Sequence, residues 1–289
     1  MRLTDRFAWG TRTYVMGILN ITPDSFSGDG LAGDRIDSVV AEAQRFAAAG
    51  ADILDIGGES TRPGAQPVTA AEECGRVVPV IRAVREALPD SVISVDTYRA
   101  DVADAALTAG ADLINDVWGL RADQALAACA AERGAPVVLM HNRSKPDQIK
   151  TDARLGGAYL GAPYDDLLAD ISRELLALAA NAEAAGIDRD QIILDPGLGF
   201  GKTAAQNLVL INRFDHFKDL GFPLLVGPSR KSFLGQILDA PVDDRLEGTA
   251  AAVAMSIARG ADIVRVHDVK EMVRVARTTD AILRASPDG

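Results

Sequence analysis

Short hydrophobic runs alternate along this chain with longer segments in which apolar residues recur at helical spacing. The runs are rich in Val, Ile and Leu, as expected for parallel strands buried on both faces. Between the first two, Ile36, Val39, Ala43 and Phe46 mark one apolar face of a helix. The pattern therefore predicts a repeated strand–helix unit, with strands near residues 15–20, 52–58, 91–96, 112–117, 136–141, 192–196, 223–228 and 262–267.

The joints between these units also repeat. Ala-Gly-Ala or Arg-Gly-Ala, followed by Asp and a strand, occurs at 49–52, 109–112 and 259–262, and glycine ends helices at low cost. Eight such units in 289 residues fit a TIM (β/α)8 barrel, which typically needs roughly 250 residues. We predict a single domain over residues 1–289 with a short strand-and-turn cap at 1–14. An open doubly wound sheet is the alternative, and it would bind ligands at one switch point.

Polar residues follow most of the predicted strands, which favours the barrel. In a (β/α)8 barrel the carboxyl ends of the strands converge on one face, and that face holds the active site. One pocket is therefore expected to collect the residues at these ends, which are Asn20, Ser60-Thr61-Arg62, Asp96, Asn115, His141, Asp195, Ser229-Arg230-Lys231, Arg265 and His267.

Four of these residues are suited to an anion. Arg62, Lys231, Arg265 and His267 come from three different strands or their loops, and the hydroxyls of Thr61, Ser229 and Ser232 lie beside them in sequence. Arginine matches phosphate oxygens with a planar fork and lysine with a point charge. The amide oxygen of Asn20 is a candidate ligand for Mg²⁺, which commonly bridges substrate phosphates. The alternative is that these cations are ordinary solvated surface charges.

Asp96, Asn115 and Asp195 form a second group, because each ends a strand of Val, Ile and Leu. A carboxylate there is costly unless it is paired or faces a pocket. Two carboxylates and an amide suit a flat heterocycle with N–H donors, although helix capping is the alternative for any one of them. The glycine-rich stretch 197–203 is not a P-loop, since Pro196 replaces its first glycine; it is expected to present Phe200 to an aromatic ligand.

Composition excludes several other classes of protein. A net charge of −11 argues against binding nucleic acid or an anionic membrane, which both need a basic surface. Cys74 and Cys129 have no paired spacing, so a disulfide is not expected, and the histidines lack zinc-site spacing. His141 either lines the pocket or is structural. No signal peptide and no apolar run of ~18 residues is present, so the protein is expected to be cytoplasmic.

The motifs GILNITPDSFSGDG, DIGGESTRPGAQPV, SVDT, INDV, LMH, DPGLGFGK, GPSRKSFLG and RVHDV follow one another along the chain. In this order and spacing they resemble the dihydropteroate synthase family over essentially the whole sequence. The resemblance implies a transferase of folate biosynthesis. Its reaction condenses 6-hydroxymethyl-7,8-dihydropterin pyrophosphate with 4-aminobenzoate and releases 7,8-dihydropteroate and pyrophosphate. The 142–163 connection looks longer than in many members of the family.

The resemblance also implies roles for individual residues. The pterin would be held by Asp96, Asn115, Asp195 and Lys231. The pyrophosphate and Mg²⁺ would be held by Asn20, Thr61, Arg62, Arg265 and His267. The aminobenzoate would lie near Pro63, Phe200, Lys231 and Ser232. Family members are commonly homodimers, and sulfonamides mimic their aminobenzoate substrate.

The chemistry of this reaction favours a dissociative substitution, in which pyrophosphate leaves first and the neutral arylamine then attacks. Donors aimed at developing charge are often the largest catalytic contribution, so the expected catalytic residues are Arg62, Asp96, Lys231, Arg265 and His267. Two alternatives stay open. A methyltetrahydrofolate–corrinoid methyltransferase would not need the cation cluster, and a silent pterin-binding paralogue would not need every chemical position to be filled.

Overall fold

Eight parallel strands form a closed barrel at the centre of the molecule, which confirms the predicted TIM barrel. The computed structural model describes residues 2–21, 32–59, 68–143, 151–152, 158–159 and 162–286. The strand order is β8-β5-β4-β3-β2-β1-β10-β9, and a parallel bridge between Leu194 and Leu224 joins the two ends of this series. The strands are β1 (Tyr14–Asn20), β2 (Ile53–Gly57), β3 (Val92–Asp96), β4 (Leu113–Asp116), β5 (Val137–Met140), β8 (Ile192–Asp195), β9 (Leu225–Val226) and β10 (Ile263–Val266).

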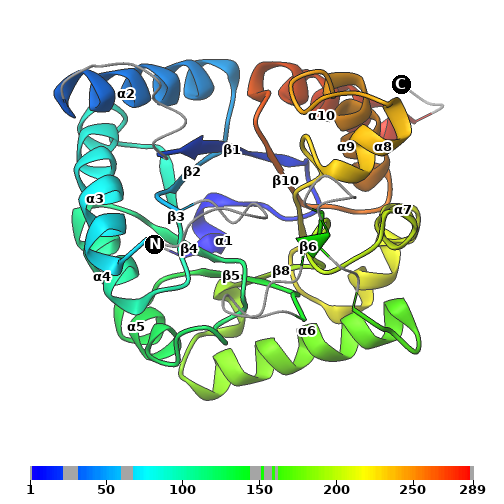
Figure 1. The fold of residues 1–289 in the computed structure, drawn as a ribbon, viewed down its shortest axis with the longest axis horizontal. Coiled ribbons are helices and arrows are strands. Elements are labelled where there is room, and N and C mark those ends of the chain that lie inside the picture. The colour runs from blue at the N-terminus through cyan, green and yellow to red at the C-terminus, as the bar shows by residue number, and fades with distance from the viewer. Residues whose placement is uncertain are drawn as a thin grey trace.

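Helices surround this barrel on its outer side (Figure 1). They pack on outward-facing residues of the strands, such as Leu54, Ile93 and Val264, in one large apolar cluster. The helices are α2 (Ala32–Ala49), α3 (Ala70–Ala87), α4 (Ala100–Ala109), α5 (Ala125–Arg133), α6 (Leu167–Ala184), α7 (Ala204–Asn212), α8 (Ser232–Leu238), α9 (Leu246–Ala258) and α10 (Val269–Arg284), with 3-10 turns at Arg189–Gln191 and Phe214–Leu220. No helix in the described segments is both long and apolar enough to cross a membrane.

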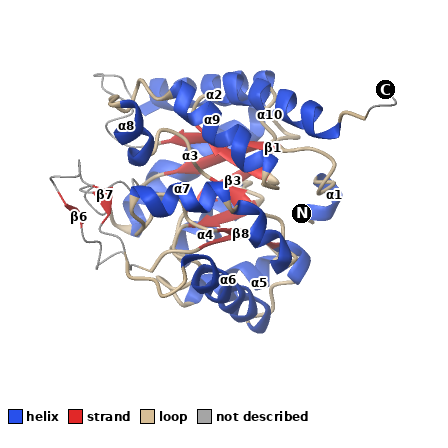
Figure 2. Cartoon of the chain, turned by 90° about the vertical axis from the view of Figure 1, so that its right-hand side faces the viewer, coloured by secondary structure: helices blue, strands red, loops and turns tan. Residues whose placement is uncertain are grey.

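The predicted strand in the N-terminal cap is wrong. Residues 3–6 form a short helix, α1 (Leu3–Arg6), and turns follow it up to β1. A helical turn places Leu3 and Phe7 on the same side, where both are buried in one cluster with the ends of the strands. The backbone N–H of Leu3 donates to Gln191 Oε1 at 2.9 Å. The helix therefore closes the amino-terminal end of the barrel (Figures 1 and 2).

The barrel interior next to α1 is a layer of apolar side chains, which we call the lower layer. It contains one residue from each of the eight strands. These residues are Met16, Ile53, Val92, Leu113, Val138, Ile193, Leu225 and Ile263. They belong to a cluster separate from the one beneath the helices.

Strand residues of the same parity point to the same side, so the residue two positions further along each strand faces the interior one level higher. We call this set the upper layer. It consists of Ile18, Asp55, Ser94, Asn115, Met140, Asp195, Gly227 and Arg265. Polar and charged residues predominate here, at the carboxyl-terminal end of the barrel. The antiparallel pair β6 (Thr151–Asp152) and β7 (Ala158–Tyr159), from the predicted long connection 142–163, lies at the opposite end of the molecule from α1 (Figure 2).

Candidate functional site

Arg265 links three strands across the barrel mouth. Its Nε donates to Asp55 Oδ2 at 2.6 Å, and its Nη2 donates to Asp96 Oδ2 at 2.6 Å. Asn115 Nδ2 donates to the same Asp55 oxygen at 3.1 Å. The structure thus brings together Asp96, Asn115 and Arg265, which the sequence analysis had placed in two separate groups. The second oxygen of Asp55, Oδ1, is buried and has no hydrogen-bond partner among the described residues.

Two carboxylates of this mouth, Asp96 and Asp195, have pKa values raised toward neutral pH. Burial raises the pKa of Asp96 to about 7; the charge of Arg265 opposes this shift and Asp55 adds to it. Burial also raises the pKa of Asp195 to about 6, against the Gly197 N–H and the charge of Lys231. A ligand that donates N–H groups to these oxygens would favour their charged forms. The mouth is therefore suited to a flat, donor-rich ring.

Asp195 is followed by the turn that presents Phe200. Asp195 Oδ1 accepts a hydrogen bond from the Gly197 N–H at 2.7 Å. Lys231 extends from the neighbouring strand-end loop, and its Nζ lies 4.1 Å from the centroid of the Phe200 ring. A side chain at Gly199 would meet Lys231 Cδ at 2.8 Å, so the turn and the lysine are closely packed. The predicted neighbours Asp195, Phe200 and Lys231 therefore lie together.

An apolar wall lies beside this turn. Val117, Trp118, Met140 and Phe200 form a separate buried cluster at the mouth, and Tyr98 packs against it. The wall after β4 is held by Asp116, which accepts from the Trp118 N–H at 2.8 Å and the Leu120 N–H at 2.5 Å. Indole and phenyl rings of this kind bind planar aromatic ligands well.

His267 lies beside Ser229, which the sequence analysis placed in the same predicted anion group. Ser229 Oγ is 3.0 Å from His267 Nδ1 and accepts from the His267 backbone N–H at 3.2 Å. If the hydroxyl donates to Nδ1, the ring keeps its proton on Nε2 as a donor. Arg230 instead pairs with Asp268, at 2.5 Å. His267 and Arg230 also line a groove of about 770 Å³ between α2 and α10, outside the barrel mouth.

Other predicted site residues are placed only in part. Thr61, Arg62 and Pro63 lie outside the described residues. Asn20 is half-buried at the end of β1, and Ser232 is exposed at the start of α8. No group of three His, Cys, Asp or Glu side chains suited to a metal occurs in the described segments. Cys74 and Cys129 are both free thiols, as predicted.

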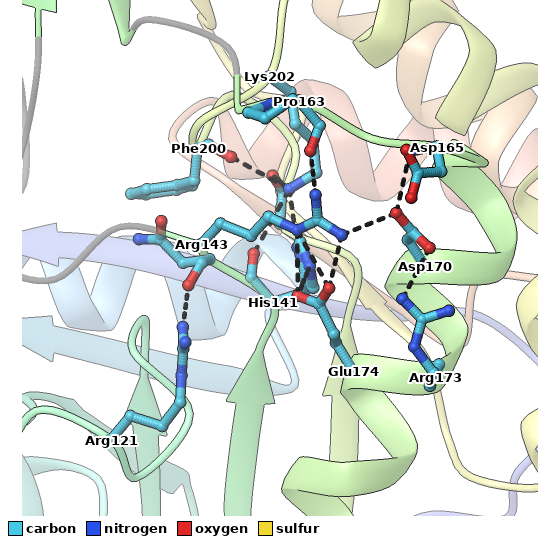
Figure 3. Close-up of polar contacts among 12 residues, drawn as sticks. Arg121, His141, Arg143, Pro163, Asp165, Asp170, Arg173, Glu174, Phe200 and Lys202 are labelled. Carbon is cyan, nitrogen blue, oxygen red and sulfur yellow. Dashed lines mark hydrogen bonds and ion pairs between the residues drawn. The ribbon is translucent and has the colours of Figure 1, made fainter.

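His141 belongs to a buried polar network behind the mouth (Figure 3). Its Nε2 lies 2.9 Å from Glu174 Oε2, and its Nδ1 lies 3.1 Å from Lys202 Nζ. Glu174 also pairs with Arg143 at 2.6 Å, and Arg143 pairs with Asp170 at 2.8 Å. Of the two readings left open for His141, the structure therefore supports the structural one.

Comparison with known proteins agrees with this geometry. Residues 16–267 match the family model described as pterin binding enzyme. A Bacillus subtilis dihydropteroate synthase is 48% identical over 272 residues, covering 94% of this chain and 89% of the relative. The chain belongs to the dihydropteroate synthase family. A Clostridium difficile dihydropteroate synthase crystallised with pteroic acid superposes with a TM-score of 0.88 at 44% identity, covering 96% of this chain and 100% of that one. The Xanthomonas albilineans enzyme with 4-aminobenzoic acid gives 0.85 at 40% identity, covering 95% and 94%.

Membership of the dihydropteroate synthase family makes this chain a transferase with the TIM-barrel fold that was predicted. Two features of the site were missed by the sequence analysis. Asp55 lies inside a hydrophobic run, between Leu54 and Ile56, and only residues at the ends of runs had been considered. The signal that could have identified Asp55 was a carboxylate within a strand that is fully buried. Lys202 appeared in the sequence analysis only as the last residue of the motif DPGLGFGK, although it is 4% exposed and has several partners.

Proposed function

We propose that this protein condenses 6-hydroxymethyl-7,8-dihydropterin pyrophosphate with 4-aminobenzoate and releases 7,8-dihydropteroate and pyrophosphate. The observation that carries the proposal is the acidic mouth in which Arg265 pairs with Asp55 and Asp96, with the Phe200–Lys231 pair beside Asp195. Carboxylates and an amide are the groups that recognise the N–H donors of a pterin ring. The adjoining phenyl ring and ammonium suit a planar benzoate.

In this proposal Asp96, Asn115 and Asp195 bind the pterin, and Lys231 lies between the pterin and the aminobenzoate. Arg265 donates to Asp55 through Nε and to Asp96 through Nη2. The third guanidinium nitrogen, Nη1, would donate to the substrate. His267 and Arg62 contribute donors to the leaving pyrophosphate. Ser232 and Pro63 complete the aminobenzoate side, and Thr61 the pyrophosphate side. These assignments follow the family motifs residue by residue.

The proposed reaction is dissociative. The methylene C–O bond breaks with its electron pair passing to pyrophosphate, the amine nitrogen attacks the methylene carbon, and the nitrogen then loses a proton to solvent. Cations near the leaving oxygens and carboxylates near the electron-poor pterin both stabilise this separation of charge. Positional isotope exchange is the measurement: a bridging ¹⁸O label should scramble in the absence of amine. A label that stays in place while pyrophosphate is shown to remain bound would contradict the mechanism.

Mg²⁺ is proposed as the metal, with Asn20 as its ligand from the protein. The half-buried amide at the end of β1 offers one neutral oxygen, which suits an ion held mainly by water and substrate phosphates. Bound Mg²⁺ would neutralise charge on the diphosphate. Calorimetry of Mg²⁺ with pyrophosphate should show tighter binding to the wild type than to Asn20→Ala.

A homodimer in the cytoplasm is also proposed. Large apolar side chains are exposed on α7, α8 and α9 and in the connection between α8 and α9, including Leu208, Ile237, Met255 and, in that connection, Val242. Such a face favours a partner surface. Sedimentation should give twice the mass of the chain, and Ile237→Asp should shift the protein toward monomer, whereas a charge added at exposed Ile282 on α10 should not.

The decisive experiment incubates the purified protein with both substrates and measures pyrophosphate and 7,8-dihydropteroate. Both should appear together, in equal amounts, and neither should form when 4-aminobenzoate or the pterin substrate is omitted. A sulfonamide should reduce both signals in competition with 4-aminobenzoate. Pterin binding without either product would instead identify a silent paralogue.

A further inference from the structure

Lys202 lies directly behind the turn that carries Phe200, at the start of α7. Its side chain is 4% exposed, and it points into the molecule toward the end of β5 (Figure 3). A buried ammonium is costly unless its donors are satisfied and its charge is balanced. Neither the chemistry proposed above nor any substrate contact accounts for a lysine in this position.

The three protons of the ammonium match three close acceptors. Lys202 Nζ lies 2.9 Å from the Gly197 carbonyl oxygen, 3.1 Å from the Phe200 carbonyl oxygen and 3.1 Å from His141 Nδ1. The His141 carbonyl oxygen is a longer fourth contact at 3.4 Å. The two nearest carbonyls are the first and last in the 197–200 turn. The ammonium therefore closes the turn from behind.

His141 must be neutral for this arrangement to hold. Because an ammonium has no lone pair, Nδ1 of His141 is the acceptor, so the ring proton sits on Nε2 and donates to Glu174 Oε2 at 2.9 Å. Burial and the charge of Lys202 lower the pKa of His141 to about 4. The hydrogen bond from His141 lowers the pKa of Glu174 to about 2, so this carboxylate is charged. The negative charge of Glu174 thus balances the positive charge of Lys202, with the neutral imidazole of His141 between them.

The front of the same turn faces the proposed site. Gly197 donates to Asp195 Oδ1 at 2.7 Å, and the Phe200 ring lies 4.1 Å beneath Lys231 Nζ. The turn is also pressed against β5, since a side chain on Gly197 would come within 2.0 Å of the His141 carbonyl oxygen. Its position is therefore set from behind, by β5 and by the ammonium.

We propose that Lys202 is a positioning residue for the aminobenzoate side of the site: its buried ammonium, oriented by His141 and Glu174, fixes the 197–200 turn so that Phe200 lies against Lys231. This inference rests on the proposed function. A purely structural role would impair the binding of both substrates, whereas the positioning role predicts a weaker binding of 4-aminobenzoate in particular. Asp195 keeps its own bond to the Gly197 N–H, so the pterin side is affected less.

The test is steady-state kinetics of Lys202→Met, which keeps the length of the side chain and removes the donors. The KM for 4-aminobenzoate should rise about tenfold, as expected when hydrogen bonds from a charged group are lost. The KM for the pterin substrate and kcat should each change by less than about threefold. Equal changes in both KM values, or no change in either, would overturn the proposal.

Two further variants keep the test decisive if Lys202→Met folds poorly. Glu174→Gln retains a hydrogen-bond acceptor for His141 but removes the balancing charge, so it should shift the same KM in the same direction by a smaller factor. Thr203→Ala, at the residue after Lys202, is the matched control. It removes the Oγ1 that accepts the capping hydrogen bond from the Gln206 N–H and does not touch the ammonium. It should lower stability and leave the ratio of the two KM values unchanged.

The pH profile supplies an independent readout. Burial lowers the pKa of Lys202 to about 7, while Asp195, Lys231, Glu174 and Arg143 are the charged groups around it. The wild-type KM for 4-aminobenzoate should therefore rise between pH 7 and 9, and this rise should be absent in Lys202→Met, which retains the other four groups. If the wild type forms no product at all, the proposed function fails; if it does and the two profiles coincide, only the role of Lys202 fails.

Discussion

The lower and upper layers of the barrel interior use the same eight strands and lie only two residues apart, yet they differ in almost every physical respect. Ile53, Leu113 and Ile193 are fully buried apolar residues, and burial of each stabilises the fold by about 1.5–3 kcal/mol. Asp55, Asn115 and Asp195, two positions on, are almost as buried and carry groups that lose hydration.

This difference shows how the barrel separates stability from binding. The lower layer needs nothing beyond good packing. The upper layer depends on one cation, since Arg265 lies within hydrogen-bonding distance of both Asp55 and Asp96. The upper layer is therefore less suited to a core than to a binding site. The cost of burying its charges shows in the raised pKa of Asp195, and in that of Asp96, which lies two residues beyond Ser94 on β3.

The contrast between the two layers is tested most strongly by removing the charge of Arg265. Arg265→Met should lower the free energy of unfolding by about 3–5 kcal/mol at pH 8, because it leaves buried carboxylates without their counter-charge. Urea denaturation measures this. Ile263→Val, in the lower layer of the same strand, is the control and should cost about 0.5–1.5 kcal/mol. Equal losses for the two variants would mean that Arg265 does not compensate the upper layer.

A pair of variants on β8 tests the separation directly. Ile193→Ala should lower the free energy of unfolding by about 2–5 kcal/mol through the cavity it leaves, with kcat/KM of the folded protein unchanged. Asp195→Asn keeps an oxygen for the Gly197 N–H, so stability should hold while kcat/KM falls about a hundredfold. Denaturation and product formation are measured on both. The separation is refuted if Ile193→Ala loses as much kcat/KM as Asp195→Asn.

The same two layers show what the sequence could reveal. All eight barrel strands were predicted, because continuous runs of Val, Ile and Leu are a local signal. Residues at the ends of these runs pointed to Asp96, Asn115 and Asp195. Asp55 was missed because it interrupts a run instead of ending it, although its parity matches Ile53 in the layer below. Alternation within a run thus carried information that the ends alone did not.

Contacts between distant segments could not be predicted in this way. The role of Lys202 depends on its contact with His141, just after β5, and on the contact of His141 with Glu174 on α6. No local sequence pattern encodes either contact. The helix at Leu3–Arg6 was mistaken for a strand because a single turn is too short to show a period. Arg62 follows a predicted strand, but its position lies outside the described residues.

A smaller effect is expected from pH. The pKa of Asp96 in the folded protein, about 7, is above its value of about 3.9 in an unfolded chain. The folded state therefore binds the proton more tightly, and the stability from this group is lost as pH rises from 4 through 7. Between pH 5 and 8 the free energy of unfolding should fall by about 2 kcal/mol more in the wild type than in Asp96→Asn.

Denaturation at a series of pH values tests this. Asp195 and Asp116, whose pKa values are raised to about 6, remain in both proteins, so their shared contribution cancels in the difference. The lowered pKa of Glu174 acts below this window. Parallel pH profiles for the wild type and Asp96→Asn would show that Asp96 is already charged in the folded protein.

The smallest effect is expected when glycines at the two ends of the barrel are replaced by alanine and the two variants are compared. Gly134 ends α5 before β5 with φ of +57°, and a Cβ there would meet nothing within 4 Å. Gly134→Ala should therefore cost only the backbone strain of about 1–2 kcal/mol and leave both KM values unchanged. Gly197, at the mouth, has φ of +76° but faces the His141 carbonyl oxygen, so Gly197→Ala should alter the site itself. A changed KM for 4-aminobenzoate in Gly134→Ala would show that backbone strain at the amino-terminal end of the barrel alters the site at the mouth. The two layers would then not be independent.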